Sequence, residues 1–316
     1  MLAYYQRDHQ AQDPPDLCFP PYYTTGPEIP RIARRVMKIS SECAPCVYLQ
    51  LMRTLDHQKI PDQRAIQAEI MTVLGAQWET LDNPGIALNM MYKIANENTG
   101  ADDAYAEDKR RVNRLADRYW NEHPIALSDI PARVLYAAAG NIIDAGLGMP
   151  PDEISQQVEQ AIAEGMARDD SAQFLNQVPK RGTILYITDN AGEIIFDREL
   201  MRSLQYNEWR IHVLVRHQPF LNDVTRDDIG SLHLEEVCDE ILDLGDDFAL
   251  WRVDFHDTRS FGQRYDGFII KGIANLEILS HRRLPAPALF VYRAKCPPSS
   301  RLAGVQWNGN VAWLQD

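Results

Sequence analysis

The stretch from Arg181 to Asp197 (RGTILYITDNAGEIIFD) constrains the fold of this chain more than any other. Its residues Thr183 to Thr188 form an uninterrupted apolar run of the kind that makes a buried strand. The polar pair Asp189-Asn190 follows at once, and after a glycine turn a helix is predicted to begin near Glu193. A buried strand that leads through a short turn into a helix indicates an open parallel α/β sheet. Such sheets bind ligands at the carboxyl ends of their strands.

Asp189 and Asn190 allow two interpretations. A carboxylate and an amide oxygen beside a helix N-terminus, where free N–H groups carry partial positive charge, suit a cation that joins the protein to a phosphate. Gly192 would permit close approach of the backbone. The simpler interpretation is that the two side chains only cap the helix, and an isolated D-N-x-G would favour it. Polar groups after two later strands favour the cation site.

Composition restricts the partners that this protein can have. The net charge of -13 and the pI near 5.1 disfavour nucleic acid and anionic membranes, so an anionic substrate would need local positive charge. The cysteines are odd in number and irregularly spaced, unlike a secreted disulfide framework. The sequence shows neither a signal peptide nor an apolar run long enough to span a membrane. We therefore expect a cytoplasmic protein.

The hydrophobic pattern divides the 316 residues into four segments. Residues 1–40 are rich in proline and aromatic residues and are predicted to form an extended arm. Residues 41–168 have the three- and four-residue spacing of helices, 169–180 are a polar connector, and 181–316 are the α/β domain. The predicted helices are Cys43–His57, Pro61–Trp78, Pro84–Asn98, Asp103–Glu122, Ile130–Ala145 and Pro151–Arg168. The predicted strands are 183–188, 210–215, 265–270 and 287–292.

Two short motifs carry separate predictions. Asn308-Gly309 stands between the apolar runs VQW and NVAWL, which predicts a β-hairpin. The pair Cys43-x-x-Cys46 could be buried thiols, a redox pair or half of a zinc site. No second cysteine pair accompanies it, which favours buried thiols. The histidines show none of the spacings that are typical of metal sites, so none is assigned to a metal.

Polar side chains follow three of the predicted strands. Asp189 and Asn190 follow the first, Asp223 comes soon after the second, and Lys271 ends a third, with Asn275 just beyond it. The carboxyl ends of parallel strands meet at one edge of a sheet, so these side chains are expected to converge. A hard divalent cation prefers the oxygen atoms of Asp189, Asn190 and Asp223, while a lysine supplies a point charge for phosphate. The combination indicates metal-assisted phosphoryl hydrolysis.

These motifs resemble the signatures of the metal-dependent damage-control phosphatases, formerly domain of unknown function 89. The resemblance covers roughly residues 41–316 and rests on several ordered motifs, each weak alone and specific together. The motifs are D-N-A-G-E followed by F-D, then N-D-V-T, K-G-x-x-N-x-E, the G-N-I-I-D of Gly140 to Asp144, Lys295-Cys296, and Cys43-x-x-Cys46, which opens many microbial members. Ile273 departs from the common glutamine, and Asp246 to Arg264 lacks a Gly-Thr element often found there.

The resemblance implies a fold, a cofactor and a set of roles. The fold is an N-terminal helical domain packed on a mainly parallel α/β sandwich, with the site between them. The cofactor is a divalent metal, manganese, nickel, cobalt or magnesium, and the substrates are small phosphomonoesters such as sugar phosphates. The implied metal ligands are Asp189, Asn190 and Asp223, and the implied substrate or phosphate contacts are Asn141, Asp144, Gly192, Glu193, Lys271, Asn275 and Lys295. For Asn141 and Asp144 a structural hydrogen bond is the equal alternative.

The predicted reaction uses Asp189, Asp223 and Lys271 as catalytic residues. The D-x-D-x-T signature of phosphatases that form an aspartyl phosphate is absent, which favours attack by water over attack by Asp189. A carboxyl methyltransferase that uses S-adenosylmethionine is an alternative, an activity also proposed within this family. D-N-A-G-E has one glycine, however, where such enzymes usually have a glycine-rich loop. A non-enzymatic protein that binds a metal or a metabolite is the third possibility.

Overall fold

The computed structural model describes residues 36–60, 62–99, 103–143, 153–243, 245, 250, 253–257 and 264–315. The chain divides into two compact units, Met1–Arg34 and Arg35–Asp316. Most of the predicted arm, and Asp144 among the predicted site residues, lie outside the described residues.

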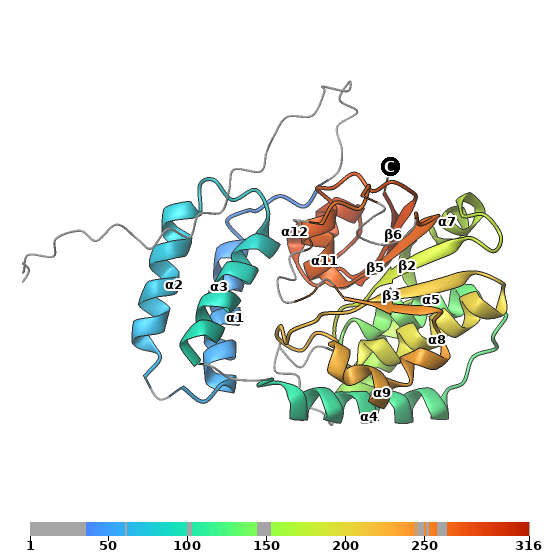
Figure 1. Ribbon diagram of the computed structural model, residues 1–316, viewed down its shortest axis with the longest axis horizontal. Coiled ribbons are helices and arrows are strands. Elements are labelled where there is room, and N and C mark those ends of the chain that lie inside the picture. Colours follow the sequence, from blue (N-terminus) through green and yellow to red (C-terminus); the bar gives the residue numbers. More distant parts are fainter. Residues whose placement is uncertain are drawn as a thin grey trace, which may run out of the picture. The chain divides into compact units, whose positions relative to one another are not determined.

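The centre of this unit is a sheet whose described strands follow the order β1-β7-β6-β5-β2-β3-β4 (Figure 1). Strands β4, β3, β2, β5 and β6 pair in parallel, whereas β7 pairs antiparallel with β6 and parallel with β1. In the register of the central strands, Tyr186 lies opposite Val213 and Ile269. The mainly parallel α/β sheet is therefore confirmed. The strands are β1 Met166–Asp169, β2 Thr183–Ile187, β3 Arg210–Leu214, β4 Glu240–Leu242, β5 Gly267–Lys271, β6 Ala288–Arg293 and β7 Asn310–Leu314.

Capping side chains, proline and glycine determine where several of the helices begin and end. The Asp129 side chain caps α5 by accepting the N–H of Ala132, and a proline occupies the first turn of that helix. Gly304 ends α12 in the left-handed conformation, with φ of 71°. The described helices are α1 Cys43–His57, α2 Arg64–Gln77, α3 Pro84–Thr99, α4 Ala106–Glu122, α5 Ile130–Gly140, α6 Ile154–Ala163, α7 Ser171–Gln177, α8 Glu193–Tyr206, α9 Ile229–Leu232, α11 Gly272–Leu279 and α12 Pro297–Ala303.

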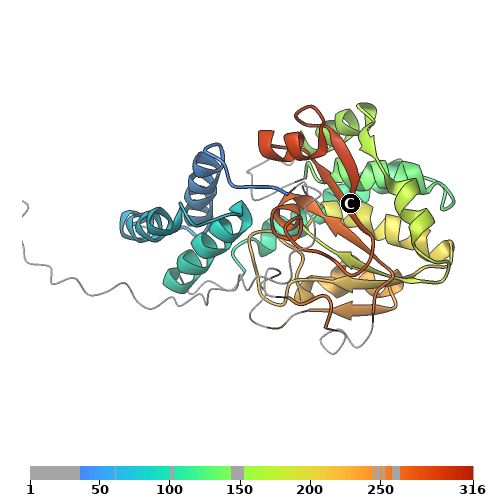
Figure 2. The same ribbon diagram turned by 90° about the horizontal axis from the view of Figure 1, so that it is seen from above.

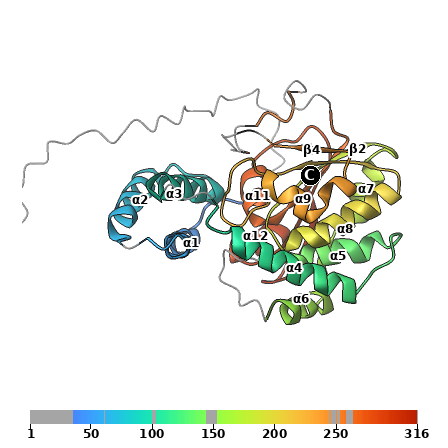
Figure 3. The same ribbon diagram turned by 60° about the horizontal axis from the view of Figure 1, so that its bottom comes forward.

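Helices cover both faces of the sheet because the central strands are apolar on both sides. All five residues of β2 are buried, and successive side chains point to opposite faces. Ile184 and Tyr186 join the core that includes residues of α4, α5 and α8, and Figure 3 shows these helices gathered on one face. Leu185 and Ile187 join the other core, to which α11 and α12 contribute. The central strands are thereby fixed from both sides.

Helix α3 packs against both α1 and α2, and the three helices are coloured blue to teal in Figure 2. The start of α3 contacts α11, because a Cβ added to Gly85 would lie 2.8 Å from the side chain of Ile278. The His57 ring of α1 stacks on Tyr105 with a centroid distance of 4.0 Å. In the described part of the chain no helix is long and apolar enough to cross a membrane.

The structure contains elements that were not predicted, among them α7 within the polar connector 169–180 and the short strand β4, and it differs from the predicted elements in two further places. The helix predicted over Pro151–Arg168 ends as α6 at Ala163, because Gly165 adopts φ of 68° and turns the chain into β1. Strand β1 therefore lies within the range that we expected to be helical. The prediction of a hairpin at Asn308-Gly309 is wrong. Asn308 does have the left-handed φ of 65° that such a turn needs, but its N–H bonds to Ala294, and the strand that follows pairs with β6 and β1.

Candidate active site

The loops after β2 and β3 bring three predicted metal ligands side by side. Asn190 and Asp223 form an isolated antiparallel bridge, and the Val224 N–H donates to the Asp189 carbonyl at 2.9 Å. A second backbone bond joins the Ala191 N–H to the Asn222 carbonyl at 2.9 Å. The two loops thus hold each other at the carboxyl edge of the sheet, where an open α/β fold binds ligands.

The side chains of this group are nearly closed off from solvent. Asp189 is 4 % exposed, Asn190 7 % and Asp223 4 %. The Asn190 amide nitrogen donates to Asp189 Oδ2 at 2.8 Å, which leaves the Asn190 amide oxygen for another partner. No group of three or more histidine, cysteine, aspartate or glutamate side chains in the described ranges is arranged to hold a metal. A cation here would use two carboxylates, one amide oxygen and water, a donor set that fits a hard divalent ion.

Gly272, the first residue of α11, allows the junction between β5 and α11 to lie close to Asp189. It has φ of 75°, and a Cβ built on it would lie 1.7 Å from Asp189 Oδ2. A side chain at this position would occupy the space of the carboxylate. The glycine in the K-G motif is therefore explained by the contact between the start of α11 and Asp189.

Arg216 is a site residue that the sequence analysis missed. Its Nε donates to Asp223 Oδ2 at 2.7 Å, and both side chains are 5 % exposed. Its guanidinium lies 4.6 Å from the centroid of the Phe220 ring. The available signal was its position, since Arg216 directly follows the apolar run IHVLV just as Lys271 follows FII. It places a permanent positive charge beside the carboxylates of an acidic chain.

Helix α4 fixes the loop that carries Asp223. The fully buried Lys109 of α4 pairs with Asp228 at 2.5 Å and with Asp103 at 2.8 Å. Asp228 in turn accepts bonds from the N–H and the hydroxyl of Thr225, two residues after Asp223. The cation of Lys109 thus connects α4 to the loop that carries Asp223.

Lys271, the residue before Gly272, is fully buried, and carboxylates inside the protein compensate its positive charge. Its Nζ is 2.7 Å from Asp197 Oδ1 and 3.4 Å from Glu193 Oε1, and it donates to the Ala137 carbonyl at 2.9 Å. Burial is the largest influence on the pKa of Lys271 and lowers it, but the two carboxylates outweigh it and leave the pKa raised. Burial raises the pKa of Asp197 to about 7 against the opposing effect of Lys271. The predicted contact of Lys271 with phosphate stays a prediction.

Asn141 connects three elements inside the protein. Fully buried at the end of α5, it donates to the Glu193 carboxylate and accepts the Arg293 N–H at 3.1 Å. Lys295 Nζ donates to the Asn141 carbonyl at 2.9 Å. These bonds support the structural alternative for Asn141, and no substrate contact follows from them.

Two further predicted residues hold strand ends and the start of α8. Asn275 donates to the carbonyls of Thr188 at 2.9 Å and Lys271 at 2.8 Å, which fixes the ends of β2 and β5. Gly192 has φ of 86° and donates its N–H to Asn113 Oδ1 at 2.6 Å. The Gly192 N–H, which was expected to face an anion, therefore donates to a side chain of α4. Asn113 is the second site residue that the sequence analysis missed.

Comparisons with known proteins identify the family. The family model described as damage-control phosphatase ARMT1-like domain matches residues 39–311. A damage-control phosphatase of Archaeoglobus fulgidus is 28% identical over 292 residues, covering 87% of this chain and 99% of the relative. Damage-control phosphatase PH1575 of Pyrococcus horikoshii is 26% identical over 272 residues, covering 84% of this chain and 94% of the relative.

A solved structure agrees with these matches. The crystal structure of a DUF89 family protein from Pyrococcus horikoshii is similar with a TM-score of 0.77 and 25% identity, and the match covers 88% of this chain and 99% of that one. The resemblance in the sequence motifs is thereby confirmed. The chain belongs to the family of the damage-control phosphatase ARMT1-like domain.

Proposed function

We propose that this protein is a metal-dependent phosphatase that hydrolyses small phosphomonoesters, such as sugar phosphates, in metabolite damage control. The observation that carries the proposal is the convergence of Asp189, Asn190 and Asp223 at the carboxyl edge of the sheet. The names of the two relatives as damage-control phosphatases support the reaction class. The substrate and the metal are the parts that this proposal adds.

The residues that would hold a divalent manganese, nickel, cobalt or magnesium ion are Asp189, Asn190 and Asp223. Their oxygen donors and their burial favour such an ion over soft metals that need thiolate or imidazole. When bound, the ion would polarise a phosphate oxygen and lower the pKa of a water. The absence of D-x-D-x-T from the sequence favours water as the nucleophile.

The chain's own residues would orient the site and favour an anion. Arg216 keeps the Asp223 carboxylate in one position through a buried ion pair at 2.7 Å. Its fixed positive charge would favour a phosphate close to the site, although the chain carries a net charge of -13. Lys271 binds Glu193 and Asp197, and so holds the first turn of α8 next to Asp189.

Phosphate release from a panel of sugar phosphates and cofactor phosphates tests the proposal. Chelator-treated protein would be assayed with each metal added back, beside Asp189→Ala and the control Asp62→Ala, whose side chain is 74% exposed. We expect release that a metal restores in the wild type and in Asp62→Ala and that Asp189→Ala lacks. Equal release by Asp189→Ala would refute the assignment. If no compound of the panel releases phosphate and the protein binds S-adenosylmethionine, methyl transfer would replace phosphatase activity as the proposed function.

A further inference from the structure

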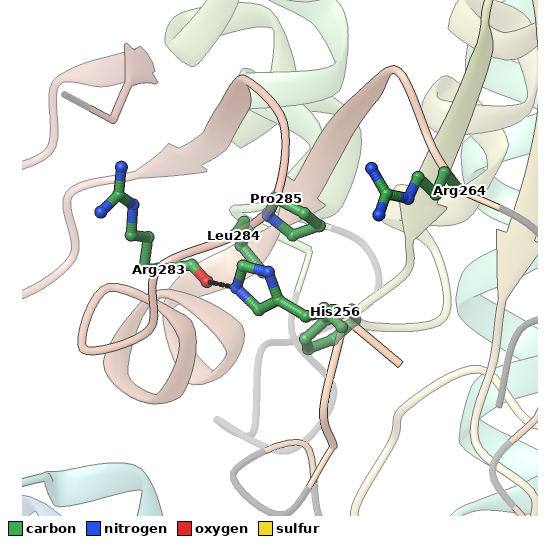
Figure 4. Close-up of a pocket in the computed structure, with 6 residues that line it drawn as sticks. His256, Arg264, Arg283, Leu284 and Pro285 are labelled. Atoms are coloured by element: carbon green, nitrogen blue, oxygen red, sulfur yellow. Dashed lines mark hydrogen bonds between the residues drawn. The ribbon is translucent and has the colours of Figure 1, made fainter. Parts of the chain in front are cut away.

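A cavity of about 400 Å³ lies away from the candidate active site (Figure 4). Arg264 precedes β5, and the turn Arg283 to Pro285 precedes β6, so the cavity lies at the amino ends of these parallel strands. Asp189 and Asp223 follow the carboxyl ends of their strands, at the opposite edge of the sheet. The cavity is therefore separate from the site described above. Its lining residues are Phe255, His256, Arg264, Arg283, Leu284 and Pro285.

The floor of the cavity is apolar and anchored in the core. Phe255 is 7% exposed and Leu284 8% exposed, and both belong to the core on that face of the sheet. The Phe255 ring packs edge-on against Phe268 of β5 with a centroid distance of 5.7 Å. A ligand with an apolar body would gain contact here without moving the fold.

Two hydrogen bonds join the walls of the cavity. The His256 ring bonds through Nε2 to the Arg283 carbonyl at 2.9 Å, as drawn in Figure 4. Arg282 donates to the Val253 carbonyl at 2.7 Å. The segment that carries Phe255 and His256 is thereby held against the turn before β6. This part of the cavity wall is formed in advance of any ligand, which lowers the entropic cost of binding.

The described residues that line the cavity include two arginines and no carboxylate. Arg264 and Arg283 are both exposed, and Figure 4 shows them on either side of His256. Within the described ranges neither guanidinium has a hydrogen bond or an ion pair. This is unusual surface for a chain with a net charge of -13, where carboxylates outnumber cations. Guanidinium groups bind phosphate and carboxylate through paired hydrogen bonds.

We propose that this cavity is a second ligand site, which takes a small organic anion. Arg264 holds its phosphate or carboxylate group, and its apolar body lies on Phe255 and Leu284. Figure 4 shows the Arg283 side chain directed away from His256, so this exposed arginine turns toward the anion when it binds. The site is independent of the proposed phosphatase reaction because it shares no residue with that site and lies at the other edge of the sheet. Failure of either proposal leaves the other intact.

Calorimetric titration with phenyl phosphate tests the site. The titrated protein is the full-length Asp189→Ala variant after chelator treatment, so that hydrolysis does not consume the probe. Arg264→Ala and Arg283→Ala are added singly in this background. The matched control is Arg114→Ala, an exposed arginine of α4 that likewise has no described partner. Thermal melting of each variant confirms that removal of an exposed side chain leaves the fold intact.

We expect one phenyl phosphate per chain, with affinity about tenfold lower in each cavity variant and unchanged in Arg114→Ala. Inorganic phosphate should bind more weakly than phenyl phosphate, because it lacks a body for the apolar floor. Unchanged affinity in both cavity variants would place the anion elsewhere and overturn the proposal. An equal loss in Arg114→Ala, or no binding at all, would overturn it as well.

Discussion

Charged side chains inside this protein form small groups, in which each charge is compensated by its neighbours. Lys271 lies between Asp197 and Glu193, and all three side chains are fully buried. A buried ion pair adds little net stability, but removing one partner leaves a charge that the interior cannot solvate. The consequence of losing one residue of such a set therefore depends on what remains.

We predict that Lys271→Met lowers the free energy of unfolding by about 3–5 kcal/mol at pH 8, where it leaves two carboxylates without their cation. The loss should be smaller at pH 6, because burial already raises the pKa of Asp197 to about 7 and that carboxyl can then bind a proton. Adding Asp197→Asn should recover part of the loss. Urea unfolding of both variants at both pH values measures this, and equal stability of single and double variant would contradict it.

Glu277 gives a second prediction, on pH dependence. It is 7% exposed, its Oε2 has no hydrogen-bond partner in the described part of the chain, and burial raises its pKa from 4.5 to about 8. Between these values the folded state keeps a proton that the unfolded state releases. The free energy of unfolding should therefore fall as pH rises from about 4.5 to about 8, and level off above.

The variant Glu277→Gln has no such proton to lose. Its stability relative to the wild type should rise by a few kcal/mol between pH 5 and pH 8, since each pKa unit corresponds to about 1.4 kcal/mol. Denaturant midpoints of the two proteins across this range give the difference. A difference that does not change with pH would show that Glu277 ionises as it does in the unfolded chain.

For individual residues, the sequence predicted the candidate site best where polar side chains follow a predicted strand. Asp189, Asn190 and Asp223 could be predicted to meet because parallel strands end at one edge. Asn113 could not be connected with Gly192, since α4 meets the start of α8 only through tertiary packing. Asp197 belongs to one of the sequence motifs, but nothing in the sequence indicated that this residue of α8 would pair with the lysine that ends β5.

At the scale of elements, the junction between β5 and α11 determines the position of Asp189. We predict that Gly272→Ala lowers kcat/KM by at least about tenfold, because its Cβ would lie 1.7 Å from Asp189 Oδ2. The matched control is Gly165→Ala, which shares the positive φ of 68° but has nothing within 4 Å of the added Cβ. Both should lose about 1 kcal/mol of stability through the strained backbone, and Gly272→Ala should lose more because its Cβ overlaps the buried Asp189 side chain.

Phosphatase assays and melting curves of the two glycine variants separate the two effects. The predicted result is a small stability loss with full activity in Gly165→Ala, and a larger stability loss with reduced activity of the still-folded protein in Gly272→Ala. Full activity in Gly272→Ala would show that the carboxylate can move without consequence, and would count against Asp189 as a site residue.

Elements were predictable where the local pattern and the tertiary structure agree. The bounds of α1 and the start of α8 match the sequence pattern, because the apolar spacing there is undisturbed. Strand β1 was missed because its four residues alternate only between half-buried and exposed, and it exists by pairing with β7, which is distant in sequence. The Asn308-Gly309 signal failed for the same reason, since long-range pairing determined the partner of β7.

At the scale of the whole molecule, two-sided burial of the parallel strands allows the loops at one edge to carry the site. Helices on both faces fix the strands, and the loops after β2 and β3 are joined to each other and to α4. The family and the fold class followed from ordered motifs along the chain. The candidate second site did not, because Arg264 and Arg283 come to line one cavity only in the folded chain.

The most direct test of the central claim is the rate of phosphate release from p-nitrophenyl phosphate as manganese is added back to chelator-treated protein. Asp223→Asn replaces the proposed carboxylate ligand by a neutral amide and so weakens the metal site, and Asp117→Asn is the control because its side chain, 44% exposed, pairs with Arg198 away from the site. We predict a saturable return of activity in the wild type and in Asp117→Asn, with none in Asp223→Asn. Activity that survives the chelator, or that Asp223→Asn retains, would contradict the account.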